Sequence, residues 1–248
     1  MPLAGAAQAG ADLLGIIFAD AWRRVPVEQA QQMVKELRER IESPPPVVGV
    51  FVNQPAEEVN RTAEAVGLDM VQLHGEETPE YWARIEWPLI VARRIPSHLS
   101  IEEAAEILSP VVEYVEPRES LSLVEPRVEG APGGAGVSLG TEMAAGLARR
   151  YPFILAGGLT PNSVGDVVRT VRPWGVDVSS GVETDEVKDA AKVRSFVEAV
   201  RAADAPKSRE LPGKGLLAKL PVLPGVEQQE DWDAYFQQMM SQLQPVGY

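Results

Sequence analysis

Two stretches of the sequence combine an apolar run with small residues, as phosphate-binding loops do. They are "LAGGLTP" (residues 155–161) and "GVDVSSGVE" (residues 175–183), and each precedes a helix-like segment. Because glycine has no side chain, a phosphate can approach its backbone N–H group closely, and serine adds a hydroxyl donor. We therefore expect one phosphate site formed by Gly157, Gly158, Ser179, Ser180 and Gly181.

Two carboxylic acids in apolar surroundings are candidates for proton transfer. Glu125 ends the run "LSLVE" and precedes a glycine-rich stretch, and Asp177 lies inside "GVDVSS". A carboxyl group in an apolar strand needs either a partner or a function, because burying an unpaired charge is costly. General acid–base catalysis uses such groups when their pKa suits the working pH. We expect Glu125 and Asp177 to be catalytic.

The elements that must position these residues alternate regularly along the chain. A helix is predicted over 25–41, where Ala30, Met33, Val34, Leu37 and Ile41 share one face. Near-continuous apolar runs are typical of parallel strands covered on both faces. Such runs occupy residues 12–18, 47–52, 69–75, 89–95, 121–125, 153–158 and 175–180. About seven strand–helix units predict an α/β fold, either a TIM (β/α)8-type barrel or a doubly wound sheet.

Two helix starts carry capping signals. Ser100 and Glu103 have the spacing of a capping box, in which each residue satisfies a backbone N–H group of the other. Thr160 before Pro161 predicts a second start, with the proline at the first helical position. The opening "PLAGAAQAGAD" has the pattern of the second half of a helix and not of a strand.

Composition narrows the class of partner. The 248 residues carry a net charge of −13, which disfavours binding to nucleic acid or to an anionic membrane. With no cysteine and two histidines, we expect no disulfide and no metal site. The first 18 residues lack the basic region of a signal peptide, so we expect a cytoplasmic protein.

Residues 205–248 differ in composition from the rest. They form a Pro/Gly-rich tail, in which Asp231–Leu243 has the pattern of a short amphipathic helix. Either the tail is loosely attached, or it docks on this domain or on a partner. We take residues 1–204 as the barrel-like domain.

Five motifs carry a resemblance to a known family. "VGVFVNQ", "VQLHGEE", "LAGGLTPNSV", "VRPWGVDVSSGVET" and "KDAAKVRSFVEAV" occur in this order. They resemble phosphoribosylanthranilate isomerase, an enzyme of tryptophan biosynthesis. The resemblance implies a TIM barrel without metal or organic cofactor. It also implies the Amadori rearrangement of N-(5-phosphoribosyl)anthranilate to 1-(2-carboxyphenylamino)-1-deoxyribulose 5-phosphate.

The same resemblance assigns roles to several residues. Glu125 stands where the family has the aspartate that serves as general acid. Arg23 aligns with the arginine that binds the anthranilate carboxylate, a pairing that guanidinium geometry favours. The remaining substrate-binding candidates are Gln72 and His74 at the mouth of the barrel and Gly134 and Gly136 in the covering loop.

The chain departs from the family in one major respect. The family's catalytic base is a cysteine on its first strand, and this chain has neither a cysteine nor a counterpart of that strand. We therefore expect a barrel that lacks its first strand and the start of its first helix. Glutamate in place of aspartate moves the carboxyl by about 1 Å, and loss of a base costs about 10²–10⁴-fold. We expect little or no isomerase activity from the isolated chain.

Three alternatives follow from this departure. The chain is an active isomerase, an impaired relative that only binds a phosphorylated ligand or a partner, or a segment of a larger multifunctional tryptophan enzyme. A homodimer, or a fused or separate partner chain, would complete the barrel. The tail is a poor substitute, because Pro221 removes a backbone donor from the run 215–223.

Overall fold

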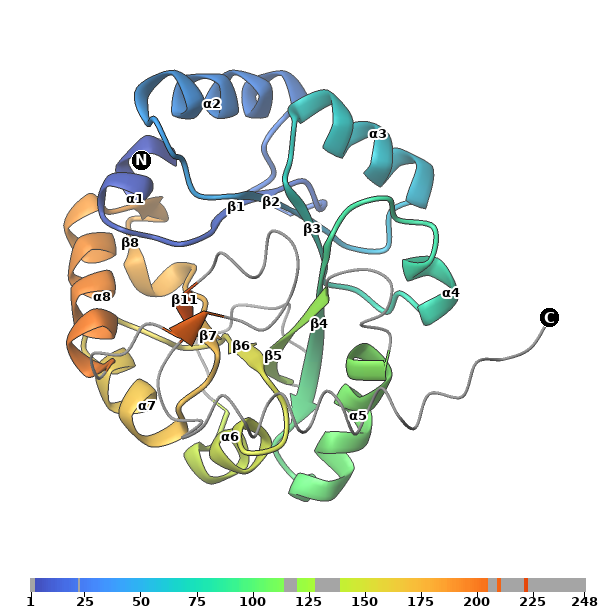
Figure 1. The fold of residues 1–248 in the computed structure, drawn as a ribbon, viewed down its shortest axis with the longest axis vertical. Helices are drawn as coiled ribbons and strands as arrows, with labels where there is room; N and C mark the ends of the chain where they lie inside the picture. The colour runs from blue at the N-terminus through green and yellow to red at the C-terminus, as the bar shows by residue number, and fades with distance from the viewer. Residues whose placement is uncertain are drawn as a thin grey trace.

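The computed structural model describes residues 3–21, 23–113, 120–127, 139–204, 209–210 and 221–222. Its main sheet has seven parallel strands in the order β1-β2-β3-β4-β5-β6-β7, curled inside a ring of helices (Figure 1). The strands are β1 (Leu14–Ile17), β2 (Val47–Phe51), β3 (Met70–Leu73), β4 (Leu89–Pro96), β5 (Ser120–Arg127), β6 (Phe153–Leu155) and β7 (Gly175–Val176). The predicted α/β barrel, short of one strand, is confirmed.

The first helix precedes β1, and each later helix follows a strand. They are α1 (Leu3–Gln8), α2 (Val27–Arg40), α3 (Ala56–Val66), α4 (Pro79–Trp82), α5 (Ile101–Glu113), α6 (Thr141–Ala148), α7 (Val164–Val171) and α8 (Ala190–Ala203). A short 3-10 turn, η1 (Ser180–Val182), leads into the antiparallel pair β8 (Glu183–Thr184) and β9 (Val187–Lys188). In the part of the chain that the structure describes, no helix has the length and apolarity needed to cross a bilayer.

Alternation along each strand separates two layers of the core. One set of side chains faces the barrel interior and includes Val48, Met70, Ile90, Leu123 and Ile154. The other set packs between the sheet and the helices, with Leu14, Ile16 and Phe51 among its members. Because strand side chains alternate with period two, every second residue that follows an inward-facing residue along its strand also points inward. This rule decides which residues reach the mouth of the barrel.

The capping signals have different outcomes. The Ser100–Glu103 box forms, with Glu103 accepting from the Ser100 N–H and Ser100 Oγ accepting from the Glu103 N–H. The predicted start at Thr160 is wrong, because α7 begins at Val164 with Ser163 in the capping position. The hydroxyl groups of Thr160 and Ser163 hydrogen-bond each other at 3.1 Å, so this segment forms a turn before the helix begins.

The tail contributes one described pair of strands. β10 (Arg209–Glu210) pairs antiparallel with β11 (Pro221–Val222), separately from the seven-stranded sheet. The predicted amphipathic helix at 231–243 lies outside the described residues.

The end of α8 carries a carboxyl group that should make stability depend on pH. Burial and the neighbouring Asp12 raise the pKa of Asp204 from 3.8 to about 6, against the opposing charge of Arg201. The folded state therefore binds the proton more tightly than the unfolded state, so the ionisation of Asp204 destabilises the fold progressively as the pH rises from 3.8 to about 6, and fully above that. We expect Asp204→Asn to raise the melting temperature at pH 8 and to lose this advantage below pH 3.8, where aspartate is neutral in both states. Calorimetry of both proteins across this range measures the difference, and a pH-independent difference would contradict the assignment.

Candidate active site

The carboxyl ends of the strands bring the candidate polar residues to one mouth. On β3, every second side chain from Met70 onward faces the barrel interior, so Gln72 and then His74 also face inward. On β5, the same alternation from Leu123 makes Glu125 face inward. Arg94 of β4 is the register partner of Glu125. The sequence predicted three of these four residues, and the structure joins all four by hydrogen bonds.

Glu125 is buried and doubly hydrogen-bonded. Its Oε1 lies 2.8 Å from His74 Nε2 and accepts from Arg94 Nε, also at 2.8 Å. Burial alone raises the pKa of Glu125, but the hydrogen bonds and charges of His74 and Arg94 outweigh it and hold the pKa below 4.5. The carboxyl group is therefore an ionised acceptor at neutral pH.

The neighbours of His74 define its tautomer. Gln72 Nε2 lies 2.8 Å from His74 Nδ1, and an amide nitrogen can only donate. Nδ1 is then the acceptor, which leaves the proton on Nε2, where it points at Glu125. Gln72, His74 and Glu125 thus form one line of hydrogen bonds in which a proton already lies between the ring and the carboxylate.

Asp177 faces the same interior from the end of β7. It lines the central cavity, where its side chain is accessible although protein surrounds it. This enclosure raises the pKa of Asp177, and the charge of Glu125 raises it further, whereas His74 and Lys188 oppose the rise. Glu125 and Asp177 therefore have pKa values moved in opposite directions within reach of each other's charge.

A second cluster links the end of β1 to the loop after β7. Arg23 forms a two-point ion pair with Glu183, with nitrogen–oxygen distances of 3.1 and 2.8 Å. Glu183 also forms an ion pair with Lys188 at 2.8 Å. Lys188 in turn donates a hydrogen bond to the carbonyl oxygen of Ser179, also at 2.8 Å. The guanidinium fork of Arg23 is thus oriented for a carboxylate, which Glu183 supplies here.

The two predicted phosphate loops pack directly against each other. Gly157 and Gly158 have φ values of 93° and 65°, which only glycine adopts readily. A Cβ atom at Gly181 would overlap the carbonyl oxygen of Leu159. The loops can approach this closely only because glycine occupies position 181. Ser179 and Ser180 flank that contact, so all five predicted residues lie in two adjoining loops.

Sequence reasoning missed Arg94 and Lys188. Counting every second residue of β4 from the inward-facing Ile90 shows that Arg94 also faces inward. Its neighbour Arg93 faces the other way, with its Cζ atom 4.8 Å from the centroid of the Trp82 ring. Lys188 gave no signal, because its position depends on the turn between β8 and β9. The predicted covering-loop residues Gly134 and Gly136 lie outside the described residues.

Comparison with known proteins places this arrangement in a family. The family model for N-(5'-phosphoribosyl)anthranilate isomerase matches residues 2–199. The chain belongs to the phosphoribosylanthranilate isomerase family. Among curated members, the Roseiflexus castenholzii N-(5'-phosphoribosyl)anthranilate isomerase is 43% identical over 201 residues, which are 80% of this chain and 92% of that one. The predicted family and its isomerase class are confirmed.

Solved structures of phosphoribosylanthranilate isomerases have the same fold. Monomers generated from the dimeric Thermotoga maritima enzyme match with a TM-score of 0.66 at 26% identity, covering 81% of this chain and 92% of that one. A second structure, in complex with reduced 1-(o-carboxyphenylamino)-1-deoxyribulose 5-phosphate, matches with a TM-score of 0.63 at 28% identity, covering 80% and 91%.

Proposed function

We propose that this chain is a cytoplasmic isomerase of tryptophan biosynthesis that acts on N-(5'-phosphoribosyl)anthranilate. The observation that carries the proposal is the pair of carboxyl groups, Glu125 and Asp177, with pKa values moved in opposite directions at one mouth. An Amadori rearrangement needs one group that gives a proton and one that takes a proton. Two carboxyl groups whose surroundings move their pKa values apart can divide the roles of proton donor and proton acceptor between them.

The proton donor is the pair formed by Glu125 and His74. The reaction begins when the furanose ring oxygen takes a proton and the ring opens to a Schiff base. In the state seen here Glu125 is ionised and His74 carries one proton on Nε2, so the pair acts as an acid only after it takes up one further proton across this 2.8 Å contact. Transfer of that proton to the ring oxygen returns the pair to the ionised carboxylate and neutral imidazole. Because one hydrogen bond joins the two groups, both share the general-acid role that the sequence assigns to Glu125.

The proton acceptor is Asp177. After ring opening, a base removes the C2′ proton to give an enolamine, which then tautomerises to the ketone. A carboxylate with a raised pKa takes a proton more readily than an ordinary one, provided that it is ionised when substrate binds. The rate should therefore rise with pH as Asp177 ionises, at a pH above the ordinary value of 3.8.

The binding groups fit the two ends of the substrate. The backbone donors of Gly157, Gly158 and Gly181 are suited to the phosphate, and the Arg23 fork is suited to the anthranilate carboxylate. In this scheme the substrate carboxylate displaces Glu183 from Arg23, and Lys188 remains as a partner of Glu183.

A turnover assay on the full 248-residue chain tests the proposal. We expect conversion above the uncatalysed rate and inhibition by the reduced product analogue, at a kcat about 10²-fold or more below that of family members with a cysteine base, because this sequence contains no cysteine. Absence of both turnover and binding of the analogue would overturn the proposal. Binding without turnover would refute the acid–base assignment while leaving the phosphate and carboxylate sites in place.

We also propose that the chain forms a homodimer, as the name of the Thermotoga maritima relative states for that protein. Light scattering at micromolar concentration gives the mass directly. A mass of 26.9 kDa would contradict the dimer.

A further inference from the structure

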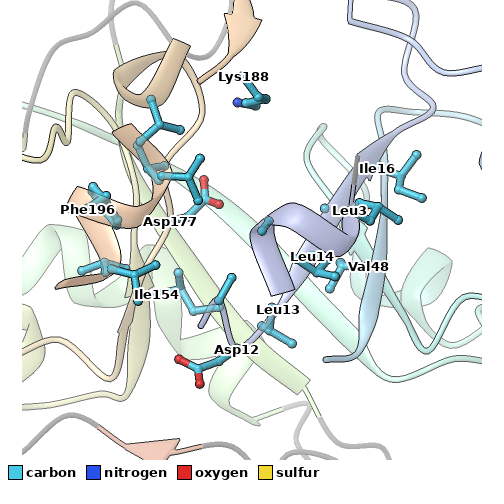
Figure 2. Close-up of a pocket in the computed structure, with 18 of the residues that line it drawn as sticks. Leu3, Asp12, Leu13, Leu14, Ile16, Val48, Ile154, Asp177, Lys188 and Phe196 are labelled. Carbon is cyan, nitrogen blue, oxygen red and sulfur yellow. The ribbon is translucent and has the colours of Figure 1, made fainter. Parts of the chain in front are cut away.

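One buried acid beside the mouth has no role in the proposed chemistry. That chemistry uses Glu125 and Asp177, and Figure 2 shows Asp177 in the central cavity. Glu77 is 7% exposed, and Glu77 and Glu125 are the two buried carboxylic acids in the part of the chain that the structure describes. Because a buried carboxyl group is costly unless it is hydrogen-bonded, the partners of Glu77 indicate what it does.

Both oxygens of the Glu77 carboxyl group accept hydrogen bonds from backbone N–H groups. Oε1 accepts from Asn53 at 2.7 Å, and Oε2 accepts from Gly75 at 2.9 Å. Asn53 lies two residues beyond the end of β2, and Gly75 lies two residues beyond the end of β3. One side chain therefore joins the ends of two neighbouring strands.

Further contacts close the same two loops around Gly75. Asn53 Oδ1 accepts from the Glu76 N–H at 2.9 Å, and the φ value of Asn53 is 53°, in the left-handed region. A Cβ atom at Gly75 would overlap Asn53 Oδ1 and lie 2.8 Å from Glu77 Oε1, so glycine allows the two side chains to come this close. We call Asn53, Gly75, Glu76 and Glu77 the Glu77 clamp.

The helix α4 anchors both loops of the clamp. Trp82 is fully buried, and its Nε1 donates to the carbonyl oxygen of Glu77 at 3.0 Å. The hydroxyl group of Tyr81 donates to the carbonyl oxygen of Gln54, next to Asn53, at 2.6 Å. The loops after β2 and β3 are thus tied to the same helix as well as to each other.

The clamp reaches His74 through one peptide group. The N–H that Gly75 donates to Glu77 belongs to the peptide bond between His74 and Gly75. The carbonyl oxygen of that peptide group accepts from Arg94 Nη2 at 3.5 Å, and Arg94 Nε donates to Glu125 at 2.8 Å. Glu77 and Arg94 therefore hold the two polar ends of one peptide group, beside the residue whose ring lies 2.8 Å from Glu125.

We propose that Glu77 is a positioning residue for the isomerase reaction, which holds the backbone beside His74 so that the imidazole ring keeps its hydrogen bond to Glu125. The inference rests on the proposed function, because it acts through the Glu125–His74 pair. Both Glu77 oxygens are bonded to backbone groups, so Glu77 affects the reaction through the placement of His74. Since a misplacement of about 1 Å can cost about 10²-fold in rate, a loosened clamp should change kcat more than KM.

Glu77→Gln tests the proposal by steady-state kinetics. Glutamine has nearly the same size but one acceptor oxygen, and its NH2 group would face a backbone N–H group in either orientation, so one clamp bond is lost. We expect kcat to fall about tenfold and KM to change by less than about twofold. Glu76→Gln is the matched control, because that side chain is exposed and Glu76 donates to the clamp through its backbone N–H. It should leave both constants unchanged.

NMR of the unliganded protein follows the hydrogen bond of His74 directly. The chain has two histidines, and His98 is exposed, so a slowly exchanging imidazole N–H resonance belongs to His74. We expect this proton to exchange with water about tenfold faster in Glu77→Gln and at an unchanged rate in Glu76→Gln. A purely structural Glu77 would lower the melting temperature and leave this exchange rate unchanged. Absence of turnover by the unmodified protein would refute the proposed function, whereas the exchange rate would still decide whether Glu77 positions His74.

Gly75→Ala loosens the same clamp from the other side. The added methyl group would push the side chains of Asn53 and Glu77 away from the Gly75 N–H. Because both substitutions break the same bond, the double variant with Glu77→Gln should lower kcat by less than the product of the two single effects. In the unmodified protein, the amide protons of Asn53 and Gly75 should exchange slowly although Asn53 is exposed.

Four results would overturn the proposal. They are equal kcat values for Glu77→Gln and Glu76→Gln, equal exchange of the His74 imidazole proton in these two variants, fully multiplicative effects of Gly75→Ala and Glu77→Gln, and fast amide exchange at Asn53 and Gly75 in the unmodified protein. The last measurement needs no substitution, so it remains decisive if Glu77→Gln fails to fold.

Discussion

Glu125→Gln is expected to lower kcat by about 10²–10⁴-fold with little change in KM. The amide oxygen of glutamine can accept the same two hydrogen bonds, from His74 and Arg94, so the geometry of the mouth is kept. What disappears is the negative charge that holds a proton on the imidazole. Steady-state kinetics with the substrate measure both constants, and thermal unfolding measures whether the fold is retained.

The matched control is Glu103→Gln. Glu103 caps α5 through Ser100 and lies at the surface, away from the mouth. The same chemical change there should leave kcat unchanged and lower the melting temperature slightly. If Glu125→Gln were as active as this control, the Glu125–His74 pair would have no part in proton donation.

The sequence was sufficient to predict which segments form strands, but not which of their side chains face inward. The runs are apolar on both faces, so only the structure separates Val48, Ile90 and Leu123 from the helix-facing layer, and the same alternation brings Glu125 to the mouth. Local signals succeeded at the Ser100 capping box and failed at Thr160. At Thr160, hydroxyl contacts with Ser163 stabilise a turn that propensity alone does not distinguish from a helix start.

Long-range pairings were beyond the sequence for a physical reason. Arg23 and Glu183 are 160 positions apart, and only the curling of the sheet brings them within 2.8 Å. The direction of the pKa shift of Glu125 also depends on Arg94, whose role cannot be separated from that of Arg93 until the strand register is known. Burial alone would have predicted the opposite direction.

Gly181→Ala should damage the phosphate site and the fold together. The added Cβ atom would overlap the carbonyl oxygen of Leu159 and come within 3.2 Å of Val178 Cγ2. Because the first of these atoms is backbone, relief requires the two loops to separate. We expect a loss of about 1–3 kcal/mol of stability, as in other overpacked sites, and a fall of about 2–12 °C in melting temperature.

Separation of the loops should also weaken phosphate binding at least tenfold, since the N–H groups of Gly157 and Gly158 would no longer face those of the second loop. Loss of two charge-assisted hydrogen bonds lowers the binding affinity by about tenfold or more. Calorimetric titration with the reduced product analogue measures the loss, and inorganic phosphate tests whether it lies at the phosphate end.

Gly165→Ala is the matched control for this prediction. It lies inside α7, where the nearest atom to an added Cβ is 3.5 Å away, so the substitution adds a methyl group without overlap. Alanine is favoured over glycine in a helix by up to about 1 kcal/mol, so this variant should be slightly more stable and bind the analogue normally. Equal analogue affinity for the two variants would show that the close approach of Gly181 to Leu159 does not shape the phosphate site.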